Sequence, residues 1–295
     1  MKTPSRRSLT ISDKLRFGPN AEVRVKSTDG TEKVGTPVVV DSNGDIVLGT
    51  GEQVVTSSPP TFEVFDDFLD AAIDTTNNWI VFEGSDGGAT VGVTITAPEG
   101  AINMGSGGAG STNDKSVLGL ILVAKGSLVS LGTTVFETRV SFDQTTGTSW
   151  GFGLGDVLPA ATEIANYKVN SGTVTDDAGI ADAVSFVFST DATATTLWQA
   201  CSTNGSTVGN AAAEESLVVG PTADTYDVLR IEVDSNGDAR FYINGVLRLT
   251  RLLAVATTAI LIPYIWGDSG DDADVATVVT NDYIKFSGTR PSSNA

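Results

Sequence analysis

The sequence predicts an all-β fold, on three observations. The 295-residue chain contains 32 glycines and many Thr, Val and Ser residues, which favour strands and turns. No long stretch repeats apolar residues with the 3.6-residue period of an amphipathic helix. Short segments instead alternate apolar and polar side chains, as half-buried strands do. With 40% hydrophobic residues, a chain of this length can bury the core of one large β domain or of two smaller ones.

The alternation is clearest between residues 230 and 250. Ile231 and Val233 alternate with polar neighbours before the turn at 235–238, and Phe241 and Ile243 continue the alternation after it. Asn-Gly pairs at 236–237 and 244–245 suit the positive φ angles of primed two-residue turns. This stretch therefore predicts three antiparallel strands in a meander.

The N-terminal part of the chain predicts a small hairpin arm. Residues 21–50 alternate around Asp29-Gly30 and Asn43-Gly44, which predicts two short hairpins. Pro59-Pro60 follows small polar residues and predicts a stiff linker. Because such hairpins cannot bury a core alone, we expect the arm to pack on another subunit or another protein. The expected division is an arm at 1–60, a sandwich at 61–291 and a tail at 292–295.

Strand signals recur through the rest of the chain without a second linker. They fall at 91–97, 135–142, 150–156, 183–190, 195–201, 228–234, 240–245, 246–250 and 282–288. About a dozen strands in roughly 230 residues fit one β-sandwich or jelly roll better than an array of small domains.

Composition excludes several classes of site. The chain has no histidine, so it contains neither a Ser-His-Asp triad nor a His-ligated metal. Cys201 is the one cysteine, and we expect it to be a small buried residue on a strand. The apolar runs at 117–124 and 259–266 are too short for a membrane helix, and no signal peptide is evident. No phosphate-binding or nucleic-acid-binding pattern is present.

Charge is distributed unevenly. Residues 1–40 carry eight basic and four acidic residues, a balance of +4, whereas the whole chain has a net charge of −18. A basic arm on an acidic body predicts that the arm docks on a negatively charged partner, although an ordinary solvated tail is the alternative. The candidate docking residues are Arg6, Arg7, Lys14, Arg16, Arg24 and Lys26.

An acidic loop is the candidate cation site. Asp268, Asp271, Asp272 and Asp274 lie close together in the sequence, and carboxylate oxygens at this density bind Ca²⁺. A solvated acidic loop is the alternative. The hexapeptide VDSNGD occurs at 40–45 and 233–238, but its glycine is misplaced for an EF-hand loop. No cofactor is therefore expected, with Ca²⁺ as the one candidate.

The sequence predicts no enzymatic activity. A glycosidase needs two carboxylates flanking the sugar bond, and the adjacent pair Asp66-Asp67 would face opposite sides of a strand. Among the aromatic residues, Trp150 and Tyr242 are candidate ligand contacts, with a place in the core as the alternative reading.

Several segments together resemble the concanavalin A-like (laminin G/lectin-like) sandwich modules of bacteriophage virion proteins. They include FDDFLDAAIDTTNNWIVFEG, TVFETRVSF, WGFGLGD, AVSFVFSTD, YDVLRIEVDSNGDARFYINGVL and NDYIKFSGTR, in this order. The similarity covers roughly residues 62–290. It implies a concanavalin A-like β-sandwich or jelly roll, preceded here by the short N-terminal β-hairpin arm. That sandwich hosts lectins, glycosidases and inert structural domains alike.

The resemblance also implies a role on the virion surface after synthesis in the host cytoplasm. The expected function is a capsid decoration or head-fibre protein, often trimeric, that the arm attaches to the major capsid protein or another virion protein. The alternative is a tail-associated adsorption protein that binds a host-surface glycan, and a polysaccharide hydrolase is the third reading. Neither a nucleic acid nor a membrane is expected as a partner.

Overall fold

In the computed structural model, the chain divides into two units, Met1–Ser57 and Ser58–Ala295. The structure describes residues 38–40, 46–48, 61–69, 73, 75, 79–83, 94–96, 101–105, 115–120, 126–147, 149–156, 167–170, 173–176, 180–190, 196–205, 213–268 and 278–289. No helix in this described part of the chain is long and apolar enough to cross a membrane.

The first unit contains one hairpin within the described residues. Strand β1 (Val38–Val40) pairs antiparallel with β2 (Ile46–Leu48), and Val38 lies opposite Leu48. This is the hairpin predicted around Asn43-Gly44. The hairpin predicted around Asp29-Gly30 lies outside the described residues, as do all six candidate docking residues of the arm.

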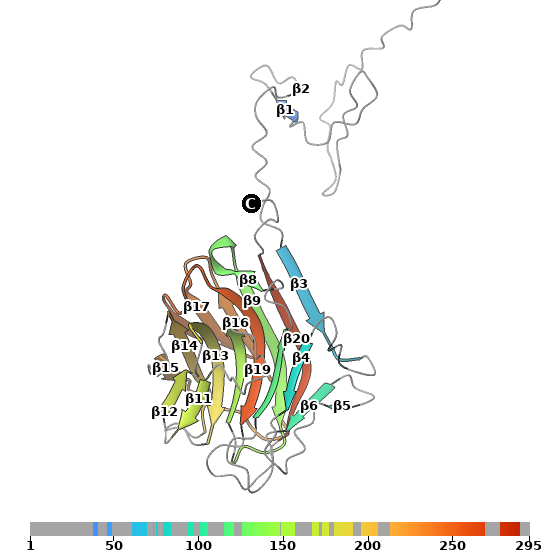
Figure 1. Cartoon of the computed structure of the whole chain (residues 1–295), viewed down its shortest axis with the longest axis vertical. Coiled ribbons are helices and arrows are strands. Elements are labelled where there is room, and N and C mark those ends of the chain that lie inside the picture. The colour runs from blue at the N-terminus through green and yellow to red at the C-terminus, as the bar shows by residue number, and fades with distance from the viewer. Residues whose placement is uncertain are drawn as a thin grey trace, which may run out of the picture. The chain divides into compact units, whose positions relative to one another are not determined.

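The second unit is built on two eight-stranded antiparallel sheets (Figure 1). We name each sheet after a central strand. The β10 sheet has the order β15-β14-β13-β10-β19-β7-β4, with β8 also paired to β19, and the β9 sheet has the order β18-β17-β16-β9-β20-β6-β5, with β3 also paired to β20. The expected sandwich is confirmed.

The strands of the β10 sheet are β4 (Trp79–Glu83), β7 (Lys115–Leu120), β8 (Ser127–Leu128), β10 (Ser149–Gly155), β13 (Asp182–Ser189), β14 (Gln199–Asn204), β15 (Ala213–Ser216) and β19 (Ile260–Asp268). Those of the β9 sheet are β3 (Thr61–Asp66), β5 (Thr94–Thr96), β6 (Ala101–Gly105), β9 (Thr134–Phe142), β16 (Asp227–Val233), β17 (Ala239–Ile243), β18 (Val246–Arg251) and β20 (Val278–Thr289). A short 3₁₀ turn, η2 (Val129–Leu131), follows β8.

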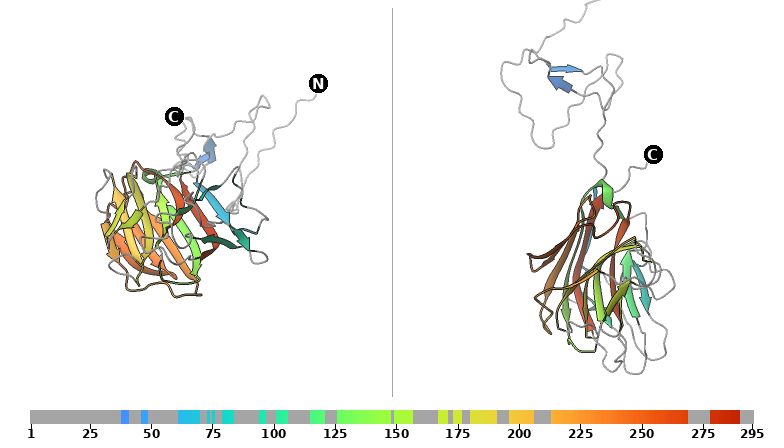
Figure 2. Two further views of the ribbon diagram at one scale, coloured as in Figure 1. Left: turned by 60° about the horizontal axis from the view of Figure 1, so that its bottom comes forward. Right: turned by 90° about the vertical axis from the view of Figure 1, so that its left-hand side faces the viewer.

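The main core fills the space between the two sheets, which Figure 2 shows from two further directions. Trp198 is fully buried there, and its ring centroid lies 5.7–6.1 Å from those of Phe142, Phe152, Phe186 and Phe188. Its indole N–H donates to Asp227 Oδ2 at 3.1 Å. Because one tryptophan joins phenylalanines of both sheets and satisfies its own polar atom, it connects the two layers.

A second hydrophobic cluster covers the outer face of the β10 sheet. Tyr167 and Val174 come from a separate hairpin, β11 (Tyr167–Asn170) with β12 (Thr173–Asp176), and pack with residues such as Cys201 and Trp266. Every residue of β10 and β13 is consequently buried. Gly151 is needed here because a Cβ atom at this position would lie 2.1 Å from Nε1 of Trp266. Cys201 is buried, as predicted.

The outer face of the β9 sheet is open by comparison. Along β16 and β17, buried residues alternate with half-buried ones, so the alternation predicted for 230–243 is confirmed. The predicted primed turn is present at Asn244-Gly245, where φ is 53° and 76°. At 236–237 only Gly237 has a positive φ, and Asp234 Oδ1 instead accepts the N–H groups of Asn236 and Asp238.

Several predicted strand boundaries need correction. The strand predicted at 195–201 begins only at Gln199 and extends to Asn204, because residues 197–198 lead into the sheet from a turn. Strands β3, β4, β6, β7, β8, β15 and β19 were not predicted, and neither was the hairpin β11–β12. Short or mixed segments carry too little local pattern, and their partners in the sheet stabilise them.

The carboxylates of Asp156, which follows β10, and Asp182, which begins β13, lie near each other. Their environment predicts that the stability of the protein depends on pH. Burial raises the pKa of Asp156 above its ordinary value of 3.8, and the nearby charge of Asp182 adds to this, while backbone N–H groups of Asp182 and Ala181 oppose it. Because the pKa of Asp156 is higher in the folded state, its contribution to the free energy of unfolding is fully present below its ordinary pKa of 3.8. That contribution is lost as the pH rises through the folded-state pKa. Asp156→Asn should therefore unfold at a higher urea concentration than wild type at pH 7, with the difference disappearing below pH 3.8.

Urea unfolding of both proteins at pH 7 and pH 3 tests this prediction. The exposed Asp224→Asn variant controls for the loss of one negative charge from an acidic protein. An Asp156→Asn variant that is equally stabilised at both pH values would contradict the assignment.

Candidate functional site

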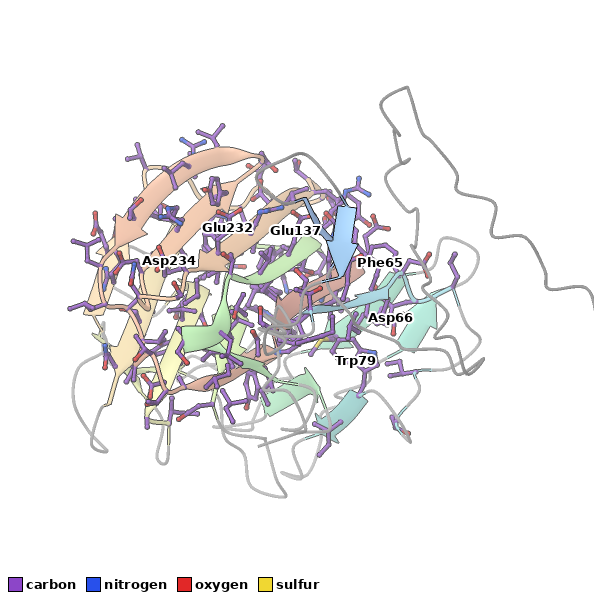
Figure 3. All side chains as sticks on the ribbon, turned by 90° about the horizontal axis from the view of Figure 1, so that it is seen from above. Phe65, Asp66, Trp79, Glu137, Glu232 and Asp234 are labelled. Carbon is purple, nitrogen blue, oxygen red and sulfur yellow. The ribbon has the colours of Figure 1, made fainter. Side chains whose placement is uncertain are left out.

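A row of side chains crosses the outer face of the β9 sheet at right angles to its strands. The pairing register places Phe65 opposite Lys285, Lys285 opposite Glu137, Glu137 opposite Arg230, and Arg230 opposite Tyr242. Directly opposed residues in antiparallel strands point to the same face. Figure 3 labels Phe65 and Glu137 on this face, with Glu232 and Asp234 over the neighbouring strands.

Arg230 joins two carboxylates at the centre of this row. Its guanidinium donates to Glu232 Oε1 from Nε at 3.0 Å and from the terminal Nη2 at 2.6 Å, and to Glu137 Oε2 at 3.2 Å. Burial lowers the pKa of Arg230, but the hydrogen bonds to Glu232 and Glu137 outweigh it, so the net shift is upward. The cation therefore holds both carboxylates as hydrogen-bond acceptors in fixed positions.

Two tyrosines complete the polar network. The hydroxyl of Tyr242 donates to Glu232 Oε2 at 3.0 Å, and that of Tyr283 donates to Glu137 Oε1 at 2.9 Å. Burial raises the pKa of both tyrosines, and the hydrogen bond to the neighbouring glutamate raises it further. Both phenols are therefore protonated at neutral pH and act as donors.

These residues line a groove of about 310 Å³. Its walls are formed by Glu137, Val228, Arg230, Glu232, Tyr242 and Gly245. The volume is at the lower end of the roughly 300–1,000 Å³ typical of small-molecule sites. The groove thus presents fixed acceptors, a fixed donor and one aromatic ring beside an aliphatic side chain.

Charges around the groove are paired with one another. Arg139 donates to Asp282 at 2.5 Å and lies 4.0 Å from the centroid of the Tyr226 ring. Elsewhere on the same face, Arg240 pairs with Asp234 at 3.2 Å and Lys285 with Glu63 at 3.1 Å. This face is consequently a mosaic of opposite charges, although the whole chain is strongly acidic.

The structure places the residues predicted for a site in different environments. Tyr242 lies in the groove, as the hypothesis of a ligand contact requires. Trp150 is fully buried in the main core and stacks near Phe152, so it has no surface to offer a ligand, and the alternative core interpretation fits its position. Asp66 of the adjacent pair accepts the indole N–H of Trp79 at 2.6 Å.

The candidate calcium loop is largely outside the described residues. Asp268 ends β19, while Asp271, Asp272 and Asp274 are not described. Within the described ranges, no group of three or more potential metal-ligating side chains comes together. In the second VDSNGD segment, Asp234 and Asp238 instead accept backbone N–H groups.

Sequence reasoning missed Glu137, Arg230, Glu232 and Tyr283 as a group. Alternation along β16 and β17 already placed Arg230, Glu232 and Tyr242 on a solvent-facing side. Glu137, however, is separated from Arg230 by 93 residues, and no local signal gives the register between such distant strands.

Comparisons with known proteins support the fold. No family model matches the chain, and no curated protein does. Among solved structures, an endo-acting O-glycanase of prominent members of the human gut microbiota that initiate mucin breakdown matches with a TM-score of 0.52 and 11% identity, over 76% of this chain and 97% of that one. The Crh5 transglycosylase in complex with NAG matches with a TM-score of 0.51 and 11% identity, over 78% and 85%.

A lectin-type domain shares the fold as well. The carbohydrate recognition domain of Emp46p, in its potassium-bound form, matches with a TM-score of 0.50 and 10% identity, over 75% of this chain and 94% of that one. These structural matches show a shared concanavalin A-like fold, and at sequence identities this low they show the fold alone. The neighbours are carbohydrate-binding or glycan-active proteins, and they show nothing of a phage origin.

The expectation that this chain is not an enzyme is therefore wrong. Two of the structures that share its fold, the O-glycanase and the transglycosylase, act on glycans. Neither the sandwich nor the lack of histidine is a ground for excluding catalysis, because the fold hosts glycan chemistry that needs carboxylates alone.

Proposed function

We propose that the second unit binds a carbohydrate in the groove at Glu137, Arg230, Glu232 and Tyr242. The observation that carries this proposal is the fixed network of donors and acceptors beside an aromatic ring. Sugars present many hydroxyls and apolar C–H faces, so they suit sites that combine placed polar groups with aromatic surface. The glycan-related neighbours of the same fold support it.

The ligand class follows from the charge pairing. Arg230 is in contact with both carboxylates of the groove, and two carboxylates beside one guanidinium leave a net charge of −1, which repels an acidic polymer. A neutral glycan fits this lining best. Its binding should depend weakly on salt, because screening acts on unpaired surface charges.

Removing the aromatic ring tests the groove. Tyr242→Ala should weaken binding about tenfold, since a well-packed aromatic contact at a binding site is worth roughly 1–2 kcal/mol. Ligands would be identified on a glycan array with and without Ca²⁺, and their affinities measured by titration calorimetry. Leu69→Ala removes an exposed apolar side chain outside the groove and serves as the matched control.

Two results would contradict the proposal. One is an array without any binding in either condition, and the other is an affinity that Tyr242→Ala leaves unchanged. The same ligands should be assayed for newly formed reducing ends, because two carboxylates lie in this groove. Hydrolysis of the glycan would assign catalysis to the groove.

A second candidate function concerns the first unit. We propose that the chain is a bacteriophage virion protein, attached to the capsid or to another virion protein through residues 1–60. The excess of basic residues in the first 40 positions, on a strongly acidic chain, supports this role, and so does the division of the chain after Ser57. The two functions are compatible, since glycan binding would help a virion to adsorb to cells.

The attachment role is tested with a chain that begins at Thr61. It should fold but no longer bind particles that lack the native protein. Undiminished decoration of those particles by the shortened chain would show that the first unit is not the anchor.

A further inference from the structure

One side of the sandwich ends in two edge strands, of which one carries basic and the other acidic residues. Strand β18 is outermost in the β9 sheet, and β15 is outermost in the β10 sheet. Arg251 of β18 links them, since it lies 3.7 Å from Glu215 of β15 and 3.4 Å from Ser202 of β14. In Figure 1, β14, β15 and β17 accordingly lie on the same side of the sandwich. We call β15, β18 and residues 252–253 the β18 edge.

Exposed apolar side chains concentrate at this edge. Seven large hydrophobic residues are exposed in the described part of the chain, and four of them belong to β18 or directly follow it. They are Val246, Leu247, Leu252 and Leu253, and the last two are 71% and 65% exposed. Exposed apolar groups that gather on one part of a protein surface are typical of interaction sites.

The backbone at Leu253 is held in a strained conformation. Its φ of 50° lies in the left-handed region, which disfavours leucine. Its N–H donates to Asp238 Oδ1 at 2.8 Å, and its carbonyl accepts from Asn204 Nδ2 at 2.8 Å. Two hydrogen bonds therefore maintain a turn that presents leucines to solvent, and strain of this kind clusters at functional positions.

Charges on the edge are complementary to those of a second copy. Arg248 is exposed and has no ion-pair partner among the described residues, whereas Glu215 on the adjoining strand is 56% exposed. Two acidic molecules repel each other over most of their surface. At this edge, however, a basic and an acidic strand lie side by side, so a copy rotated by 180° can match each with its opposite.

We propose that the chain forms a two-fold dimer through the β18 edge, in which β18 of each copy faces β15 of the other. The two-fold axis runs along the strands, so that Arg248 approaches Glu215 of the partner copy while the exposed leucines become buried. The other edge-to-edge arrangement pairs β18 with β18 and brings two basic strands together, which like-charge repulsion disfavours. The dimer takes the place of the trimer that the family resemblance implies.

The β-bulge of β18 favours contact through side chains over a continuous sheet. Its register with β17 shifts between Phe241 and Tyr242, and bulges bend an edge strand away from regular pairing. The interface therefore depends on the exposed leucines and on the charge match. Both can be altered without changing the backbone hydrogen bonds between β17 and β18.

Sedimentation velocity of the full-length chain over a range of concentrations tests the dimer. Arg248→Glu and Leu252→Asp should each weaken association about tenfold or more, because both groups are buried or paired at the contact. Glu215→Arg should weaken it as well. The double variant Arg248→Glu/Glu215→Arg should restore association towards that of the wild type, since it exchanges the charges across the interface.

Leu69→Asp is the matched control, because Leu69 is 68% exposed but lies outside this edge. Thermal unfolding followed by circular dichroism verifies that each variant is folded. A wild-type chain that is monomeric at every concentration overturns the proposal. So does association that Arg248→Glu and Leu252→Asp leave unchanged, or a double variant as weak as the single ones.

Discussion

Replacing Trp198 by alanine is expected to destabilise the second unit by about 3–5 kcal/mol, the range for removing a large aromatic side chain from a core. Trp198 is fully buried among four phenylalanine rings contributed by both sheets. The substitution leaves a cavity that the opposed sheets cannot close, and it leaves Asp227 without the indole donor. Chemical denaturation followed by tryptophan fluorescence and circular dichroism measures the loss.

Trp198→Phe is the matched control for this prediction. It keeps an aromatic ring in the core and removes the hydrogen bond to Asp227, so a smaller loss is expected. If alanine and phenylalanine cost the same, the packing of the ring does not carry the stability, and the central role assigned to Trp198 is wrong.

Gly153→Ala is expected to destabilise the protein by about 3 kcal/mol, at the upper end for overpacked interiors. A Cβ atom at this position would lie 2.1 Å from the carbonyl oxygen of Val184 and 2.6 Å from Cα of Ser185. These are backbone atoms of the neighbouring strand β13, so no side-chain rotation relieves the contact. The two strands would have to separate in the middle of the β10 sheet.

Gly205→Ala separates this clash from the general cost of replacing glycine. Gly205 has a φ of 59° and nothing within 4 Å of the added Cβ atom, so only backbone strain of about 1 kcal/mol is expected. The urea midpoints of the two variants give the comparison. A Gly153→Ala variant no less stable than Gly205→Ala would show that β10 and β13 are not packed as described.

Local sequence pattern was sufficient for the class of fold and for parts of its detail. Alternation located β16, β17 and β18 to within one or two residues, and the Asn244-Gly245 pair identified a turn that needs two positive φ angles. Tyr242 was a candidate ligand contact with a place in the core as the alternative, and the same alternation sets it apart from the buried Phe241 and Ile243. These features depend only on residues that are close together in the chain, so each can be recognised within a single segment.

The outer face of β10 illustrates where local pattern fails. In the sequence this strand alternates large side chains with Ser149, Gly151 and Gly153, which resembles a strand with one solvated face. In the structure both faces are buried, because the hairpin β11–β12 and Trp266 cover the second one. A strand does not encode whether a distant segment will lie over it.

The groove itself depends on contacts between distant segments. Arg230 and Glu232 are neighbours on β16, yet Glu137 reaches them from β9 and Tyr242 from β17 only because the strands pair in one register. A shift by one residue would send each of these side chains to the opposite face. Alternation and turn chemistry are local and can be read along the chain, whereas strand register and the covering of a sheet arise from burial of the whole core, so they exist only in the folded molecule.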